Sequence, residues 1–154
     1  MQIFADAYTP VVDSSAIPTG EIASVEGTPM DFRTEKQIGQ DIRADFEQLH
    51  FTGGYDHNYV LGRPGEKKIM ANAYCRESGI ALEAETDCCG VQFYAGNFIG
   101  EQTGKGGASY HDRSAFCLES QFYPNAVNEP DFPSPVVKAG HTYHTETSYR
   151  FYLR

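Results

Sequence analysis

Short runs of alternating apolar and polar residues, separated by clusters of glycine, proline, asparagine and aspartate, make up most of this chain. The clearest run covers residues 142–153, where every second residue from Tyr143 to Leu153 shares one face. Such a period of two predicts β-strands. Residues 68–75 and 80–86 flank Glu77-Ser78-Gly79 and predict a hairpin. Further strands are expected over residues 2–7, 57–61, 91–93 and 115–121.

One segment has helical spacing instead. Over residues 34–46, Ile38, Ile42 and Phe46 would share one helix face, but Gly39 interrupts the pattern. We therefore expect one or two helical turns there. Many short strands with regular turn signals, and at most one short helix, predict an all-β fold, an antiparallel β-sandwich.

The composition narrows the class of protein. The chain has 154 residues, 40% of them hydrophobic and 21% charged, and no repeat or linker, so we expect one globular domain over residues 1–154. Acidic residues outnumber basic ones by 21 to 12, which disfavours nucleic acid and anionic membranes as partners and leaves a small neutral or cationic ligand open. The first residues show no basic region followed by an apolar run, so we expect no secretory signal and a cytoplasmic location.

The four cysteines do not indicate a metal site. No pair has the C-x-x-C spacing, and two adjacent cysteines cannot both ligate zinc without strain. We expect reduced thiols, no metal and no other cofactor. The cysteines are Cys75, Cys88, Cys89 and Cys117.

Three polar positions interrupt apolar strand patterns. Between Phe116 and Gln121, alternation places Glu119 on the face opposite Leu118. A carboxylate in such a strand either points to water or lines a polar cleft, because charged residues are rare inside sheets. Taken alone, Glu119 is more often a solvent-facing residue than a catalytic one.

The other two positions carry hydrogen-bonding side chains suited to a sugar. A Gly-Gly turn precedes Asp56, His57 and Asn58, and Gln92 shares a strand face with Tyr94. Amides and carboxylates bind sugar hydroxyls, and an aromatic ring packs against the C–H face of a sugar. Each position also has a purely structural interpretation. Asp56, His57 and Asn58 would then be turn residues at the start of a strand, and the Gln92 amide would pair with backbone groups at a sheet edge.

Together, and in order, these blocks resemble the C-terminal half of aldose 1-epimerases, the galactose mutarotase family. The resemblance implies a galactose mutarotase-type β-sandwich that interconverts the α and β anomers of free hexoses such as glucose and galactose. The blocks that carry it are Ala5-Asp6-Ala7-Tyr8-Thr9-Pro10-Val11, Ile17-Pro18-Thr19-Gly20-Glu21-Ile22, Gly27-Thr28-Pro29-Met30-Asp31-Phe32-Arg33, Gly54-Tyr55-Asp56-His57-Asn58, Gly90-Val91-Gln92-Phe93-Tyr94, Gly96-Asn97-Phe98, Phe116-Cys117-Leu118-Glu119-Ser120-Gln121, Pro124-Asn125-Ala126-Val127-Asn128 and Phe132-Pro133-Ser134-Pro135.

The resemblance also implies roles. Glu119 matches the general base of the family, and Asp56 and Gln92 match residues that bind sugar hydroxyls. His57 and Asn58 belong to the same substrate-binding block and are expected to position Asp56. The general acid of the family is a histidine that precedes the matched region, so it is expected outside this chain. His111 and His144 are the only stand-ins to consider, and the sequence places both on exposed positions, so no acid is assigned.

Half a sandwich leaves strand edges and an apolar face uncovered, so we expect the chain to self-associate or to pair with a missing N-terminal half. A non-catalytic sugar-binding or regulatory module is the main alternative function. A glycoside hydrolase ranks third, because it needs a second carboxylate roughly 5–9.5 Å from Glu119 and the blocks resemble mutarotases.

Overall fold

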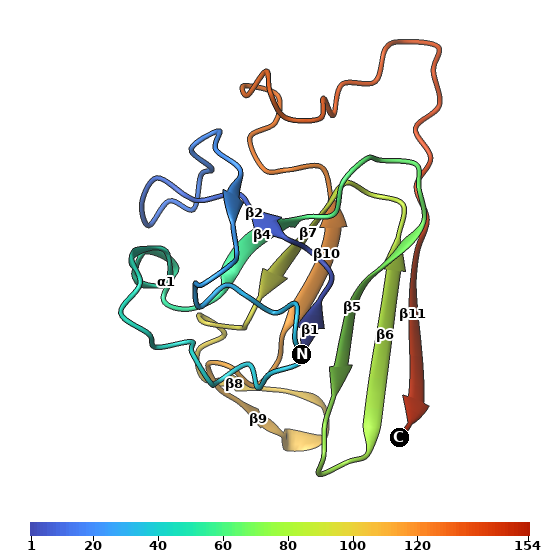
Figure 1. Ribbon diagram of the computed structural model, residues 1–154. Helices are drawn as coiled ribbons and strands as arrows, with labels where there is room; N and C mark the ends of the chain where they lie inside the picture. Colours follow the sequence, from blue (N-terminus) through green and yellow to red (C-terminus); the bar gives the residue numbers. More distant parts are fainter.

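The computed structural model describes residues 1–154 and consists of two antiparallel sheets around a shared core, with a small separate hairpin (Figure 1). The first sheet has the order β1 (Gln2–Ile3), β5 (Lys68–Tyr74), β6 (Ile80–Thr86) and β11 (Thr147–Leu153). The second has the order β10 (Cys117–Gln121), β7 (Gly90–Tyr94), β4 (Asp56–Val60), β2 (Ala7–Tyr8) and β3 (Ala23–Ser24). The hairpin is β8 (Gln102–Thr103) and β9 (Ser109–Tyr110), with the short 3-10 turn η1 (Lys105–Gly107) between them. The predicted all-β antiparallel sandwich is confirmed.

Aromatic side chains pack the irregular segment around Phe32 against the second sheet. Tyr55 stacks on Phe93 at 5.5 Å between ring centroids, and Phe32 meets both rings edge-on. All three are almost completely buried. The hydroxyl of Tyr55 donates to the carbonyl oxygen of Pro29 (3.1 Å) and that of Tyr59 to Met30 (3.0 Å). The core therefore ties the irregular segment before Phe32 to the second sheet without leaving these phenols unpaired.

The prediction of a helix over residues 34–46 is wrong. That segment forms isolated turns, in which Gln40 N–H donates to Gln37 and Ala44 N–H to Asp41. Its apolar spacing still has a structural meaning, because Ile42 is buried and its two predicted partners on the helix face pack against the core. A segment wrapped over a core needs apolar residues every few positions, and this requirement does not depend on a helix.

The single α-helix, α1 (Glu47–Thr52), follows directly. It ends at Gly53, which has φ 67°, a left-handed conformation that glycine adopts without strain. The Gly-Gly pair was therefore also a helix stop signal. No helix in the structure combines the length and apolar character needed to cross a membrane.

The strands otherwise follow the alternation, with shifted ends. The β5–β6 hairpin is confirmed, and residues 2–7 divide into β1 and the start of β2. The last strand begins only at Thr147, because the residues after β10 form a long connection that arches over the end of both sheets (Figure 1). The short strands β3, β8 and β9 were not predicted, since two residues carry no usable period.

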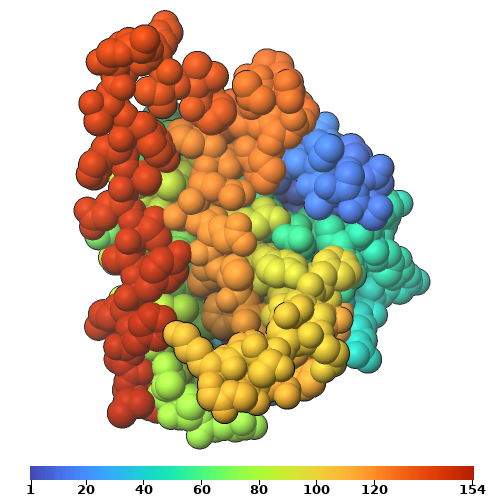
Figure 2. All heavy atoms as spheres, turned by 180° about the vertical axis from the view of Figure 1, so that it is seen from behind, coloured from blue at the N-terminus to red at the C-terminus, as the bar shows by residue number.

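The edge strands of the two sheets, β10 and β11, run side by side (Figure 2). Side chains join these strands: Ser120 and Thr147 hydroxyls lie 2.6 Å apart, and the Tyr149 hydroxyl donates to the carbonyl oxygen of Leu118 (2.7 Å). Phe151 lies opposite the buried Leu82 of β6, yet 68% of Phe151 is exposed. Core-facing apolar groups of β11 are therefore uncovered on this side.

Candidate functional site

The strand register brings the predicted polar residues together. Glu119 of β10 lies opposite Gln92 of β7, and Gln92 lies opposite Asn58 of β4. The adjacent row pairs Cys117 with Tyr94 and Tyr94 with Asp56. Directly opposed residues on antiparallel strands share a face. Asp56, Gln92 and Glu119 therefore project from three neighbouring strands to the same side of the second sheet, away from the core.

Asp56 and Gln92 form the best-defined contact of this site. The Gln92 side-chain Nε2–H donates to Asp56 Oδ1 at 2.7 Å, and both side chains are half-buried. Burial raises the pKa of the Asp56 carboxyl above its ordinary value, and the hydrogen bond from Gln92 partly opposes that shift. The pair presents a carboxylate and an amide in a fixed mutual orientation, which suits the hydroxyls of a polar ligand.

Glu119 is exposed at the edge of the same face. Burial raises the pKa of the neighbouring Cys117 thiol, and the charges of Glu119 and Asp56 raise it further. The pKa of Tyr149 is raised by burial and by Glu119 and Cys117. Sequence reasoning missed both neighbours. The alternation already placed Cys117 on the face of Glu119, whereas the contact of Tyr149 is purely tertiary and left no local signal.

Asn58 lies in the Glu119 row but is only 1% exposed. A Cβ atom on Gly90 would lie 2.3 Å from Asn58 Oδ1 and 2.9 Å from Cδ1 of Tyr123. The Asn58 amide therefore fills the space above Gly90, beneath the Tyr123 ring. The buried Asn58 side chain therefore packs underneath the surface of the site and does not reach solvent.

His57 requires a correction. Its side chain points to the opposite face of the sheet, where it is fully buried against Tyr8 at 5.9 Å between ring centroids. A direct substrate contact by His57 does not fit this position, because successive residues of a strand face opposite sides. Its ring Nδ1 accepts a hydrogen bond from the Asp56 backbone N–H (3.3 Å), so a role in positioning Asp56 stays a prediction.

Acid is expected to destabilise the fold through His57. Burial lowers the pKa of His57 to about 4, below the ordinary value of 6.5, so the unfolded chain binds the proton more tightly. Stability should fall as the pH drops from 6.5 towards 4, by about 1.4 kcal/mol per pH unit. Guanidinium unfolding at about pH 7 and about pH 5 should show a loss about 2 kcal/mol larger for the wild type than for His57→Gln. The exposed His50→Gln variant is the control, and equal acid losses in all three proteins would contradict the assignment.

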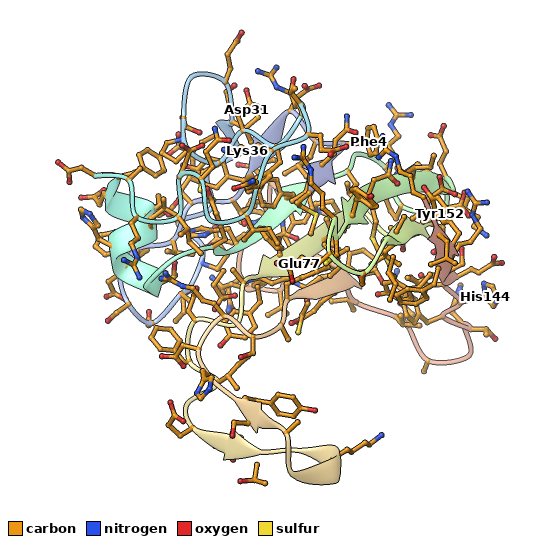
Figure 3. The ribbon with its side chains drawn as sticks, turned by 90° about the horizontal axis from the view of Figure 1, so that it is seen from below. Phe4, Asp31, Lys36, Glu77, His144 and Tyr152 are labelled. Carbon is orange, nitrogen blue, oxygen red and sulfur yellow. The ribbon has the colours of Figure 1, made fainter.

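The other histidines do not pair with Glu119. His111 contacts Glu101 (2.8 Å) near the β8–β9 hairpin, which projects away from the sheets, and His144 lies at the periphery, in the connection before β11 (Figure 3). His50 pairs with Asp45 in another part of the surface. The structure contains no group of three or more His, Cys, Asp or Glu side chains placed to hold a metal ion.

Comparison with known proteins decides the family. A sequence model of the family described as aldose 1-epimerase matches residues 1–150. The chain belongs to the aldose 1-epimerase family. Galactose mutarotase from Bos taurus is 45% identical over 150 residues, which cover 97% of this chain and 42% of the relative. Aldose 1-epimerase from Escherichia coli K12 is 37% identical and covers 98% of this chain and 44% of the relative.

Solved structures agree with the family fold. A GalM/aldose epimerase homologue from C. elegans superimposes with a TM-score of 0.82 at 30% identity, covering 99% of this chain and 45% of that chain. Galactose 1-epimerase from Lactobacillus acidophilus shares the fold at a TM-score of 0.67 and 22% identity. The chain thus spans less than half the length of these relatives.

Proposed function

We propose that this chain forms the base-bearing part of a mutarotase site that interconverts the α and β anomers of free hexoses such as glucose and galactose. The observation that supports it is the single face shared by Asp56, Gln92 and Glu119, with the hydrogen bond between the first two already formed. Membership of the aldose 1-epimerase family gives that arrangement its chemical meaning.

The chemistry needs one base and one acid. The Glu119 carboxylate takes the proton of the anomeric hydroxyl, the C1–ring-oxygen bond breaks, and an acid delivers a proton to the ring oxygen. Rotation about the C1–C2 bond exposes the other face of the aldehyde. The ring hydroxyl then adds to it, its proton returns to the acid, and Glu119 returns its proton to the new anomeric oxygen. Asp56 and Gln92 hold sugar hydroxyls, and no step requires a cofactor.

We also propose that full activity requires the remaining part of a family-length protein. Glu119 has no histidine partner within this chain. On the core-facing side of β10, opposite to the face of Glu119, Phe116 and Phe151 border an apolar hollow of about 370 Å³ that also reaches Leu82. A polypeptide that covers this hollow and continues around the β10 edge would bury the β11 side chains and place its own acid across the sugar from Glu119.

A sugar-binding module without turnover is the second candidate. The complete Asp56–Gln92 pair, beside a Glu119 that lacks an acid partner, favours it for the chain in isolation. Binding and turnover separate the two functions. Galactose should shift the NMR signals of Gln92 in either case, whereas only an enzyme accelerates the change in optical rotation.

A chimera tests the proposed function. In it, this chain replaces the matched 42% of the Bos taurus galactose mutarotase. Polarimetry on freshly dissolved α-D-galactose should show accelerated mutarotation by the chimera and a rate at least about 10²-fold lower for this chain alone, since a positioned acid contributes about 10²–10⁴-fold. Light scattering should show self-association of the isolated chain and a monomeric chimera.

Each outcome has a clear meaning. A folded but inactive chimera would contradict the mutarotase function. Full activity of the isolated chain would contradict the need for a second part. A stable monomer of the isolated chain, with no binding of a hydrophobic dye, would contradict the proposed covering of the β11 face.

A further inference from the structure

A row of polar side chains crosses the second sheet from Thr9 to Glu119. The Thr9 backbone N–H donates to the Asn58 carbonyl oxygen (2.9 Å), Asn58 lies opposite Gln92, and Gln92 lies opposite Glu119. Opposed residues share a face and have Cβ atoms about 4.5–5.5 Å apart. Thr9, Asn58 and Gln92 therefore form one line behind the Glu119 carboxylate.

Four polar atoms in this line are buried and have no hydrogen-bond partner within the protein. They are Thr9 Oγ1, Asn58 Nδ2, Asn58 Oδ1 and Gln92 Oε1. Thr9 and Asn58 are each only 1% exposed. Unpaired buried polar groups are unfavourable, and folded proteins nearly always pair them with protein atoms or ordered water. Their concentration in one row indicates a shared partner.

The enclosure of the row limits what that partner can be. Asn58 Oδ1 occupies the position that a side chain at Gly90 would take, and Tyr123 covers it. A sugar on the exposed side of Gln92 cannot reach Thr9 without displacing this cover. A water molecule is small enough and typically makes about three hydrogen bonds when buried.

We propose that Thr9, Asn58 and Gln92 bind one internal water molecule, through which Thr9 and Asn58 act as positioning residues for the Gln92 side chain. The water donates one proton to Gln92 Oε1, and its remaining bonds are to the Asn58 amide and the Thr9 hydroxyl. Because the hydrogen bond from the water fixes Oε1 of Gln92, Nε2 of the same amide stays directed at Asp56 Oδ1, with which it makes the 2.7 Å contact.

This network has a readout that does not depend on turnover. The groups that face the Asp56 carboxyl are Gln92, which donates to it, and Tyr94, Cys117 and Glu119 on the neighbouring strands. If the Gln92 amide is no longer held, its bond to Asp56 weakens and the pKa of Asp56 rises. A merely structural role of Asn58 would lower stability and leave that pKa in place.

The experiment is a ¹³C NMR titration of the carboxyl groups, with the Asp56 signal assigned through Asp56→Asn. Gln92→Leu removes the donor and sets the upper limit of the shift. Asn58→Leu should raise the pKa of Asp56 part of the way to that limit. It should also remove one long-lived water molecule from the magnetic relaxation dispersion of the protein. An unchanged pKa in folded Asn58→Leu, or an unchanged number of long-lived waters, would overturn the proposal.

A second pair of variants keeps the test decisive if Asn58→Leu does not fold. Thr9→Val keeps the shape but removes the hydroxyl, and Thr9→Ser keeps the hydroxyl. The first should raise the pKa of Asp56 and the second should restore it. Equal values in both variants would overturn the proposal. Since neither readout needs a sugar, the result is independent of whether the proposed mutarotase function holds.

Discussion

Replacing Glu119 by glutamine is expected to lower the mutarotation rate of the chimera by about 10²–10⁴-fold, the usual contribution of a general base. Glutamine keeps the size and the polar character of the side chain but cannot take the proton of the anomeric hydroxyl. Glu119 is exposed and pairs with no other side chain, so the exchange should change the free energy of unfolding by no more than about 0.5 kcal/mol. The loss should appear in kcat, while galactose binding persists.

Glu101→Gln is the matched control for this prediction. Glu101 is also exposed, but it pairs with His111 near the β8–β9 hairpin. Polarimetry with both variants, together with thermal unfolding, separates loss of the base from a general effect of removing a negative charge. If Glu119→Gln retained the rate of the Glu101→Gln control, Glu119 would not be the base.

Truncating Phe93 to alanine is expected to have the largest effect on stability. Phe93 is completely buried and contacts Tyr55, Phe32 and Phe116 through its ring. Phenylalanine-to-alanine substitutions in cores cost about 3–5 kcal/mol. Since whole domains are stable by only about 5–15 kcal/mol, the variant should be close to unfolding at room temperature.

Guanidinium unfolding, followed by circular dichroism because the chain has no tryptophan, measures this loss. Phe98→Ala removes the same atoms from a side chain that is 70% exposed, and it should cost much less. Similar midpoints for the two variants would show that the aromatic cluster does not stabilise the core.

The alternation of apolar and polar residues along β4, β7 and β10 was enough to predict the three strands that carry the site. It was also enough to separate His57 from its neighbours, since a strand turns every second side chain to the opposite face. The prediction that His57 belongs to the same substrate-binding block as Asp56 and Asn58 relied on their proximity in the sequence and neglected this alternation. The alternation alone therefore places the His57 side chain on the core face.

The segment over residues 34–46 shows the opposite case. Apolar residues at helical spacing and a threonine at its start satisfied the helix signals, yet the segment packs on the core as a series of turns. Helix propensity is weak compared with tertiary packing, and Gly39 lowers it further. The spacing of apolar residues could not distinguish one face of a helix from a series of turns that contacts the same core.

Side-chain periodicity is a local property, so the order of residues alone specified the all-β class, the longer strands and the face on which each of their side chains lies. Register is not local. That Glu119 lies opposite Gln92, and Gln92 opposite Asn58, depends on how strands far apart in the chain align, and core packing chooses that alignment. The tertiary structure likewise decided that Tyr123 encloses Asn58 and that β11 stays uncovered, because burial depends on what the rest of the molecule places nearby.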